Sequence, residues 1–162
     1  MNFERKLEEL GVSIPNLPKL ESSFVPAVIS GNLVFVSGNT PTVNGKLKYL
    51  GKLGKEVSLE QGQDAARLAV INCLAALRQT LGSLDRVTRI VKLNGYVASG
   101  IGFNQQPLVI NGASNLLKEI FGTAGEHARA AIGVAELPGS APVEIELVVE
   151  VQRKIPLKVS GI

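Results

Sequence analysis

The segment from Val143 to Gln152 constrains the fold most strongly, because apolar and polar residues alternate along it. Val143, Ile145, Leu147, Val149 and Val151 alternate with Glu144, Glu146, Val148, Glu150 and Gln152. This period of two is typical of a β-strand with one face in the core. The glutamates on the other face would point to solvent, to a neighbouring strand or into a cavity.

A second apolar run, Ala130 to Ala135, precedes this strand, and the loop from Leu137 to Pro142 separates the two. The proline and glycine residues of the loop end one strand before the next begins, so we expect an antiparallel pair. Arg129 and Glu144 would then each stand at the start of a strand. Only a bent loop or an intervening chain could bring their side chains to one site.

The rest of the chain alternates helix and strand signals. The expected elements are a short amphipathic helix ending at Gly11, a hairpin turning at Gly31 and Asn32, a loop or irregular hairpin over 42–55, a helix from the Ser58–Gln61 capping box to Gly82, a strand from Val87 to Ala98, and a helix from Pro107 to Gly122. This order predicts an α+β fold, with two long helices packed on one face of the sheet. We expect a single domain over 1–162, with a helical extension over about 1–20.

Composition excludes several classes of protein. The 17 Lys and Arg residues give a net charge of +3 but are scattered, so a nucleic-acid partner is not expected. Cys73 is the only cysteine, which excludes an internal disulfide and a multi-cysteine zinc site, and its helical spacing indicates a core position. The first ten residues lack the apolar core of a secretory signal, and no stretch is long enough to span a bilayer. A cytoplasmic protein with no membrane partner is the simplest interpretation.

Two residues stand out for chemistry. Arg129 offers a planar fork of donors that matches a carboxylate, although on the sequence context alone a surface ion pair is the simpler explanation. Glu144 could hold or deprotonate a water molecule, or it could be an exposed strand residue as Glu146 and Glu150 are expected to be. His127 is the only histidine and has no serine or cysteine partner at a recognisable spacing, so we expect a structural or solvated side chain rather than a triad or a metal ligand.

Several segments together resemble the YjgF/Rid family, which is also named for an endoribonuclease activity of some members. They are the run Ala27–Pro41, Asn111, Arg129, the run Val134–Pro138 and the run Val143–Glu146. The similarity extends from about Phe24 to Val151. It implies a chorismate-mutase-like fold with a mixed β-sheet and a homotrimer with pockets in the clefts between subunits.

The resemblance also implies roles for individual residues. Arg129 would bind the substrate carboxylate, and Glu144 would position the attacking water. Ser37, Gly38 and Asn111 would line the pocket. The sequence departs from the family pattern at two places, with Phe24 where many members have a tyrosine and Ala131 where many have a cysteine. The backbone carbonyl of Ala131 could still bind water, whereas Phe24 lacks the hydroxyl group.

Three functions remain open on these grounds. The leading hypothesis is hydrolysis of small 2-imino acids to 2-oxo acids and ammonia, without a metal or an organic cofactor. The alternative is a catalytically inactive trimer that binds small carboxylates or has a regulatory role. An endoribonuclease ranks third, because only the family name and a diffuse basic charge favour it.

Overall fold

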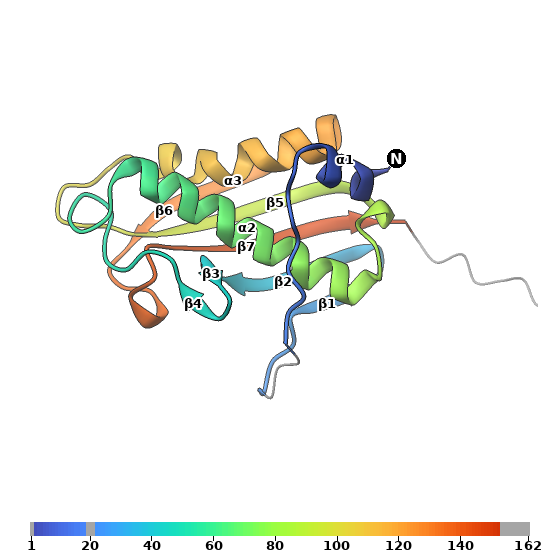
Figure 1. The fold of residues 1–162 in the computed structure, drawn as a ribbon, viewed down its shortest axis with the longest axis horizontal. Helices are drawn as coiled ribbons and strands as arrows, with labels where there is room; N and C mark the ends of the chain where they lie inside the picture. Colours follow the sequence, from blue (N-terminus) through green and yellow to red (C-terminus); the bar gives the residue numbers. More distant parts are fainter. Residues whose placement is uncertain (1, 19–21, 153–162) are drawn as a thin grey trace, which may run out of the picture.

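The computed structural model describes residues 2–18 and 22–152 and shows two long helices lying across one face of a β-sheet (Figure 1). The elements are α1 (Phe3–Glu9), β1 (Ala27–Ser30), β2 (Leu33–Asn39), β3 (Thr42–Val43), β4 (Lys46–Leu47), α2 (Leu59–Leu81), η1 (Leu84–Arg86), β5 (Val87–Ala98), α3 (Gln106–Phe121), η2 (Gly122–Gly125), β6 (Ala128–Val134), η3 (Pro138–Ser140) and β7 (Val143–Val151). The expected element order and the α+β arrangement are confirmed. Residues 19 and 20 of the expected extension lie outside the described residues.

Local signals in the sequence explain where the long elements begin and end. The Ser58 side chain accepts a hydrogen bond from the Gln61 backbone, and the Gln61 side chain accepts one from the Ser58 backbone, which completes the capping box of α2. Gly82 ends that helix in a left-handed conformation. Gly31, at φ 64°, makes the tight turn between β1 and β2.

The main sheet has the strand order β1-β2-β7-β5-β6. The predicted antiparallel pairing of the last two strands is therefore wrong: β6 pairs parallel with β5, and β7 lies between β2 and β5, antiparallel to both. The crossover through α3 explains the parallel pair, because a strand, a helix and a second strand normally fold back in this way. Alternation within a strand identifies its buried face but does not identify its neighbours.

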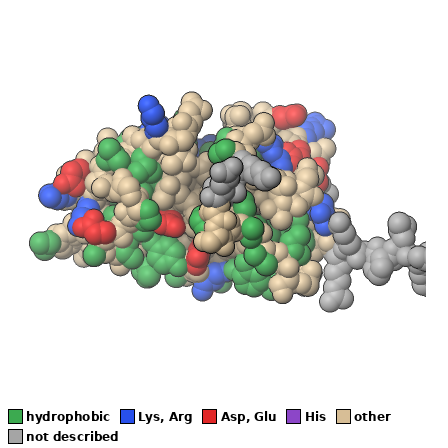
Figure 2. Space-filling model, turned by 90° about the horizontal axis from the view of Figure 1, so that it is seen from below, with side chains coloured by type: hydrophobic (Ala, Val, Ile, Leu, Met, Phe, Trp, Pro, Cys, Tyr) green, Lys and Arg blue, Asp and Glu red, His purple; other side chains and the backbone are tan. Residues whose placement is uncertain are grey.

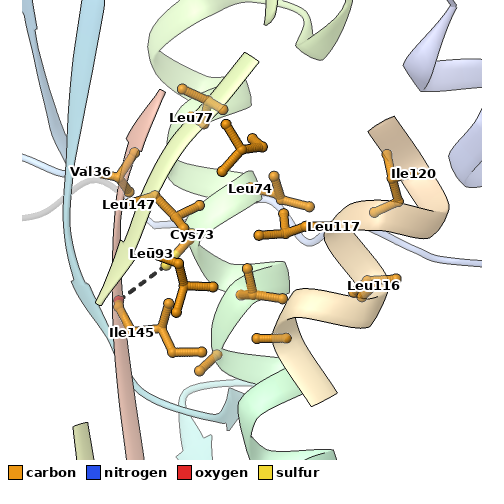
Figure 3. Packing of buried hydrophobic residues seen from close by; sticks show 14 of the residues in the cluster. Val36, Cys73, Leu74, Leu77, Leu93, Leu116, Leu117, Ile120, Ile145 and Leu147 are labelled. Carbon is orange, nitrogen blue, oxygen red and sulfur yellow. Dashed lines mark hydrogen bonds between the residues drawn. The ribbon is translucent and has the colours of Figure 1, made fainter. Parts of the chain in front are cut away.

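The core fills the space between the helices and one face of the sheet. Figure 3 shows strand side chains such as Leu93 and Leu147 and helix side chains such as Leu74 and Leu117 gathered in one buried cluster. Cys73 is buried there as predicted, and its Sγ lies 3.2 Å from the Ile145 carbonyl oxygen. Burial raises the pKa of this thiol, so Cys73 is an inert core residue.

The N-terminal segment packs against the same helices. Phe3 of α1 stacks edge-on against Phe121, with ring centroids 4.6 Å apart. The chain then crosses α2, where Arg78 Nη2 donates a 2.7 Å hydrogen bond to the Ile14 carbonyl oxygen (Figure 1). Among the described helices, none has both the length and the apolar character needed to cross a membrane.

The opposite face of the sheet has no helix over it. Val28, Phe35 and Val148 form a row across β1, β2 and β7 on this face, and Ile132 of β6 also points there. Val28, Phe35 and Ile132 are exposed, whereas Val148 is half-buried. Figure 2 views the molecule from the side on which β1 lies and shows hydrophobic side chains among charged ones on that side. Such an exposed apolar face is typical of a surface that another chain covers.

Candidate functional site

Arg129 lies on the edge strand β6 and points toward α3. It stands opposite Leu93 in the parallel pair, so both side chains project to the helix-covered face. Arg129 Nη1 donates to Asn111 Oδ1 at 2.8 Å and to Ser114 Oγ at 3.2 Å. Within the described residues no carboxylate lies within salt-bridge distance of Arg129, so the surface ion pair that the sequence left open is not present there.

Two glycines allow α3 to approach closely enough for these contacts. Gly95 of β5 lies directly beneath Ile110, whose side-chain carbon would be 2.5 Å from an added Cβ. Gly112 packs against the backbone carbonyl of Gln63 on α2, where an added Cβ would overlap the carbonyl oxygen. The close packing of α3 holds Asn111 at the edge strand, where it meets Arg129.

His127 has a serine partner that the sequence analysis missed. Its Nε2 lies 3.0 Å from Ser114 Oγ, and its Nδ1 lies 2.6 Å from the Gly125 carbonyl oxygen. Ser114 therefore contacts both His127 and Arg129. These contacts agree with the expectation of a structural histidine, although the sequence spacing did not indicate the serine partner. One signal was present: residues 127 and 129 have the period-two spacing that places both on one face of a strand. The pairing with α3 could not be read from spacing in the sequence.

Burial lowers the pKa of His127, and the nearby Arg129 charge lowers it further, against the raising effect of the Gly125 carbonyl. These groups border a shallow hollow of about 340 Å³. Its lining residues are Ser114, Asn115, Lys118, Gly125, Glu126, His127 and Arg129. The hollow is cationic on the Arg129 side, because Lys118 is already paired with Glu126 at 3.0 Å.

Glu144 differs from the other glutamates of β7. Glu146 accepts hydrogen bonds from Asn94 and Tyr96, and Glu150 accepts one from Asn32. Both are half-buried, so the expectation that they are exposed strand residues is wrong. The Glu144 carboxylate makes no such bond within the described chain, and burial, followed by the charge of Glu146, raises its pKa.

Gly38 makes room for this carboxylate. A Cβ built on Gly38 would overlap Glu144 Oε1, so only glycine leaves the Glu144 side chain in its present position. Phe24, Ser37 and Gly38 line a neighbouring pocket of about 190 Å³. The Ser37 hydroxyl donates to the Val25 carbonyl oxygen at 2.7 Å, which fixes the strand end rather than offering the hydroxyl to a ligand. Phe24 is 57% exposed and supplies an apolar ring at the pocket wall.

The candidate residues therefore form two clusters in one chain. The cationic cluster comprises Arg129, Asn111, Ser114 and His127, and the acidic cluster comprises Glu144, Gly38, Ser37 and Phe24. Ala131, which packs half-buried against the core, lies on the same face of β6 as Arg129.

The two clusters lie on opposite faces of the sheet. Arg129 stands opposite Leu93 on β5, whereas Glu144 stands opposite Tyr96 three residues further along. β6 and β7 are two strand spacings apart, on either side of β5, and the two residues are offset by three positions along the strands. The Cα atoms of Arg129 and Glu144 are therefore about 14 Å apart. One chain alone does not bring the guanidinium and the carboxylate to one small substrate.

No group of three or more His, Cys, Asp or Glu side chains suited to a metal ion occurs within 2–18 and 22–152. The cationic cluster can bind a small anion through the guanidinium. The acidic cluster can accept a proton from water or from a ligand.

The five-stranded mixed sheet with two long helices on one face identifies the chain as a small α+β protein. Its two candidate clusters lie on opposite faces of this sheet. Residues 4–150 match the family described as "YjgF/chorismate mutase-like, putative endoribonuclease". The chain belongs to this family, and its fold is the chorismate-mutase-like fold.

Known relatives support the assignment. Protein TCP17 of Trypanosoma cruzi is 40% identical over 89% of this chain and 91% of its own length. The crystal structure of a protein of unknown function from Agrobacterium tumefaciens is 45% identical, covers 92% of this chain and 91% of its own, and superposes with a TM-score of 0.84. A 2-iminobutanoate/2-iminopropanoate deaminase of Dermatophagoides farinae is 29% identical over 87% of this chain and 95% of its own length.

Proposed function

We propose that the protein is a homotrimeric hydrolase that converts small 2-imino acids to 2-oxo acids and ammonia. The strongest support is the combination of a pre-positioned guanidinium, Arg129, with a carboxylate of raised pKa, Glu144, that has no hydrogen-bond donor among the described residues. The deaminase from Dermatophagoides farinae supports the same class of substrate.

Arg129 would bind the substrate carboxylate. Its hydrogen bonds to Asn111 and Ser114 both leave from Nη1. The edge formed by Nε and Nη2 therefore keeps two parallel donors, the arrangement that binds a carboxylate bidentately. A guanidinium remains charged at every working pH, so binding would persist across the range in which Glu144 titrates.

Glu144 would act on water. The imine reacts with its nitrogen protonated. As the water oxygen forms a bond to the imine carbon, one water proton passes to the Glu144 carboxylate, and the C=N bond electrons become the lone pair of a neutral amine. Glu144 then gives this proton to the amine, the C–N bond breaks as the carbonyl forms, and the hydroxyl proton returns to Glu144 and from there to solvent. A carboxylate of raised pKa is a better base for the first step and remains able to deliver the proton in the second.

A second copy of the chain would bring the clusters together. Arg129 lies at a sheet edge and Glu144 on the uncovered face, so the edge of one subunit can approach the face of the next. The exposed Val28, Phe35 and Ile132 give this face apolar area for such an interface. A trimer of 17.1 kDa chains would have a mass of about 51 kDa in solution, which native mass spectrometry or light scattering would measure.

The activity is tested by generating 2-iminopropanoate or 2-iminobutanoate in situ with an amino-acid oxidase and following the release of ammonia. Wild-type protein should accelerate the release, and Arg129→Gln and Glu144→Gln should each abolish most of the acceleration. Asn115→Ala is the matched control, because Asn115 borders the Arg129 hollow but its exposed side chain makes no hydrogen bond to the residues that the structure describes. The proposal would be overturned if the wild-type protein released ammonia no faster than the reaction without protein, or if Arg129→Gln retained full activity.

Phe24 favours a second candidate, a trimer that binds small carboxylates without turning them over. If a hydroxyl at this position stabilises the transition state, its absence costs about 100-fold in rate. Tight binding of 2-oxobutanoate without imine hydrolysis would identify this case. Phe24→Tyr should then restore turnover.

Ribonuclease activity remains the weakest of the three candidates. Three of the four lysines in 42–55 are paired, Lys48 with Asp64, Lys52 with Glu136 and Lys55 with Glu56. This pairing leaves the most basic stretch little net positive charge for phosphates. Single-stranded RNA incubated with the purified protein should remain uncut.

A further inference from the structure

A chain of hydrogen bonds runs from η2 through the cationic cluster to α3. The Gly125 carbonyl oxygen lies 2.6 Å from His127 Nδ1, and His127 Nε2 lies 3.0 Å from Ser114 Oγ. Arg129 Nη1 reaches Ser114 Oγ at 3.2 Å and Asn111 Oδ1 at 2.8 Å. Arg129, which lies on an edge strand, is thus bonded directly to α3 and is connected to η2 through Ser114 and His127.

The direction of each bond follows from the chemistry of the groups. A carbonyl oxygen can only accept, so His127 Nδ1 carries the hydrogen and, in the neutral ring, Nε2 is the acceptor. The Ser114 hydroxyl therefore donates to Nε2. Because Arg129 can only donate, the Ser114 lone pairs receive the guanidinium hydrogen. With neutral His127, Nδ1 donates to the Gly125 carbonyl, Nε2 accepts from Ser114, and Ser114 accepts from Arg129.

We propose that His127 and Ser114 are positioning residues that, together with Asn111, hold Arg129 in the orientation that receives the substrate carboxylate. The inference rests on the proposed function, because it assigns a purpose to the orientation of Arg129. An arginine on a strand edge has many side-chain conformations, and binding in one of them loses that freedom. The two acceptors on Nη1 restrict the side chain to one conformation before the substrate binds, so binding costs less conformational entropy. They leave the Nε–Nη2 edge free for the substrate carboxylate.

A Ser–His pair could also be a nucleophile and its base. Here Ser114 Oγ also accepts a hydrogen bond from the Arg129 guanidinium, and a cation bound to the oxygen makes it a weaker nucleophile. The Ser114 hydroxyl is therefore better placed to orient the guanidinium than to attack a substrate.

The surrounding charges favour the neutral form of His127. Arg129 on β6 faces it directly and, after burial, lowers its pKa. Lys118 of α3 and Glu126 lie in the same hollow but are paired with each other. Arg89 of β5 and Glu150 of β7 border His127 on the other side. A proton on Nε2 would make His127 a donor to Ser114, which would then face donors from two cations.

The first experiment determines the tautomer of His127 by ¹⁵N nuclear magnetic resonance of the assembled wild-type protein at pH 7.5. His127 is the only histidine, so the ring signals need no assignment by mutation. We expect hydrogen on Nδ1 and a bare Nε2, and a change in the Nε2 shift in Ser114→Ala. Hydrogen on Nε2, or a spectrum that Ser114→Ala leaves unchanged, would overturn the inference.

The second experiment measures the dissociation constant for 2-oxobutanoate by calorimetry. Ser114→Ala and His127→Asn should each weaken binding by about tenfold, the worth of one hydrogen bond that fixes a charged group. His127→Gln retains an acceptor at the Nε2 position and should bind nearly as tightly as the wild type. The double variant Ser114→Ala/His127→Asn should bind no more weakly than Ser114→Ala alone, because both changes interrupt the same chain. Asn115→Ala should have no effect.

The outcomes separate this inference from the proposed function. Wild-type binding that neither Ser114→Ala nor His127→Asn weakens would overturn the positioning roles and leave imine hydrolysis standing. A protein that binds 2-oxobutanoate as expected but hydrolyses no imine would contradict the enzyme and support the positioning roles. A wild-type protein that binds no 2-oxo acid would overturn both.

Discussion

Gly38→Ala offers a sharp test of the acidic cluster, because it moves one carboxylate without touching the core. The added Cβ would overlap Glu144 Oε1 and would lie 3.1 Å from Glu144 Cδ. The obstructing atom is the far end of a flexible side chain, so the carboxylate moves and the backbone stays. Restoring a normal contact requires a displacement of about 1 Å, which can cost about 100-fold in rate when the displaced group acts on the reacting atoms.

A 100-fold loss corresponds to about 2.7 kcal/mol of activation free energy. The free energy of unfolding should change by less, about 1 kcal/mol, because the collision is relieved by rotation of a half-buried but flexible side chain. Hydrolysis of 2-iminobutanoate, measured as ammonia release, should therefore fall about 100-fold in kcat while the urea unfolding midpoint falls by only about 0.5 M.

The matched control is the double variant Gly38→Ala/Glu144→Gln. If Gly38→Ala acts only by displacing Glu144, the double variant should be no slower than Glu144→Gln alone. A Gly38→Ala protein with wild-type kcat would refute the role of Glu144 as the base. A double variant 100-fold slower than Glu144→Gln would show that Gly38 acts by another route.

Three further predictions follow from the same contacts. Arg129→Lys keeps the charge but loses the planar fork, so the dissociation constant for 2-oxobutanoate should rise about tenfold or more in calorimetry, with Arg129→Gln weaker still. Glu144→Gln should raise the free energy of urea unfolding at pH 7.5, because the raised pKa shows that the fold disfavours the charged carboxylate. This gain should shrink as the pH falls through the raised pKa and vanish below the ordinary value of 4.5, and a gain that persists there would contradict the cause. Gly112→Ala should destabilise the protein by about 1–3 kcal/mol in the same assay, because the new Cβ forces α3 away from the Gln63 carbonyl oxygen despite a better helix propensity. A more stable Gly112→Ala protein would show that α3 is not held at this distance.

The sequence predicted the long elements well because their signals are local. The alternation through β7, the Ser58 capping box and the glycine that ends α2 each depend on neighbouring residues only, and the structure confirms all three. The buried position of Cys73 follows from the same helical spacing.

Pairing and long-range contacts could not be predicted in the same way. Nothing in β6 or β7 indicates that β5 lies between them, so the strand pair was placed wrongly. The contact between Ser114 and His127 joins a helix face to the start of an edge strand, and it depends on how closely α3 packs on the sheet. The family resemblance therefore identified the candidate residues but did not predict that they lie on two different faces of the sheet.

The central claim is that Arg129 of one subunit and Glu144 of another complete one site, and mixed trimers test it directly. Arg129→Gln and Glu144→Gln chains, each inactive alone, should be denatured together at equal amounts and refolded. If each site takes its arginine from one chain and its glutamate from the next, roughly one quarter of the sites will contain both residues. Imine hydrolysis should then return to about a quarter of the wild-type rate. Mixed trimers as inactive as either parent would contradict a site shared between subunits.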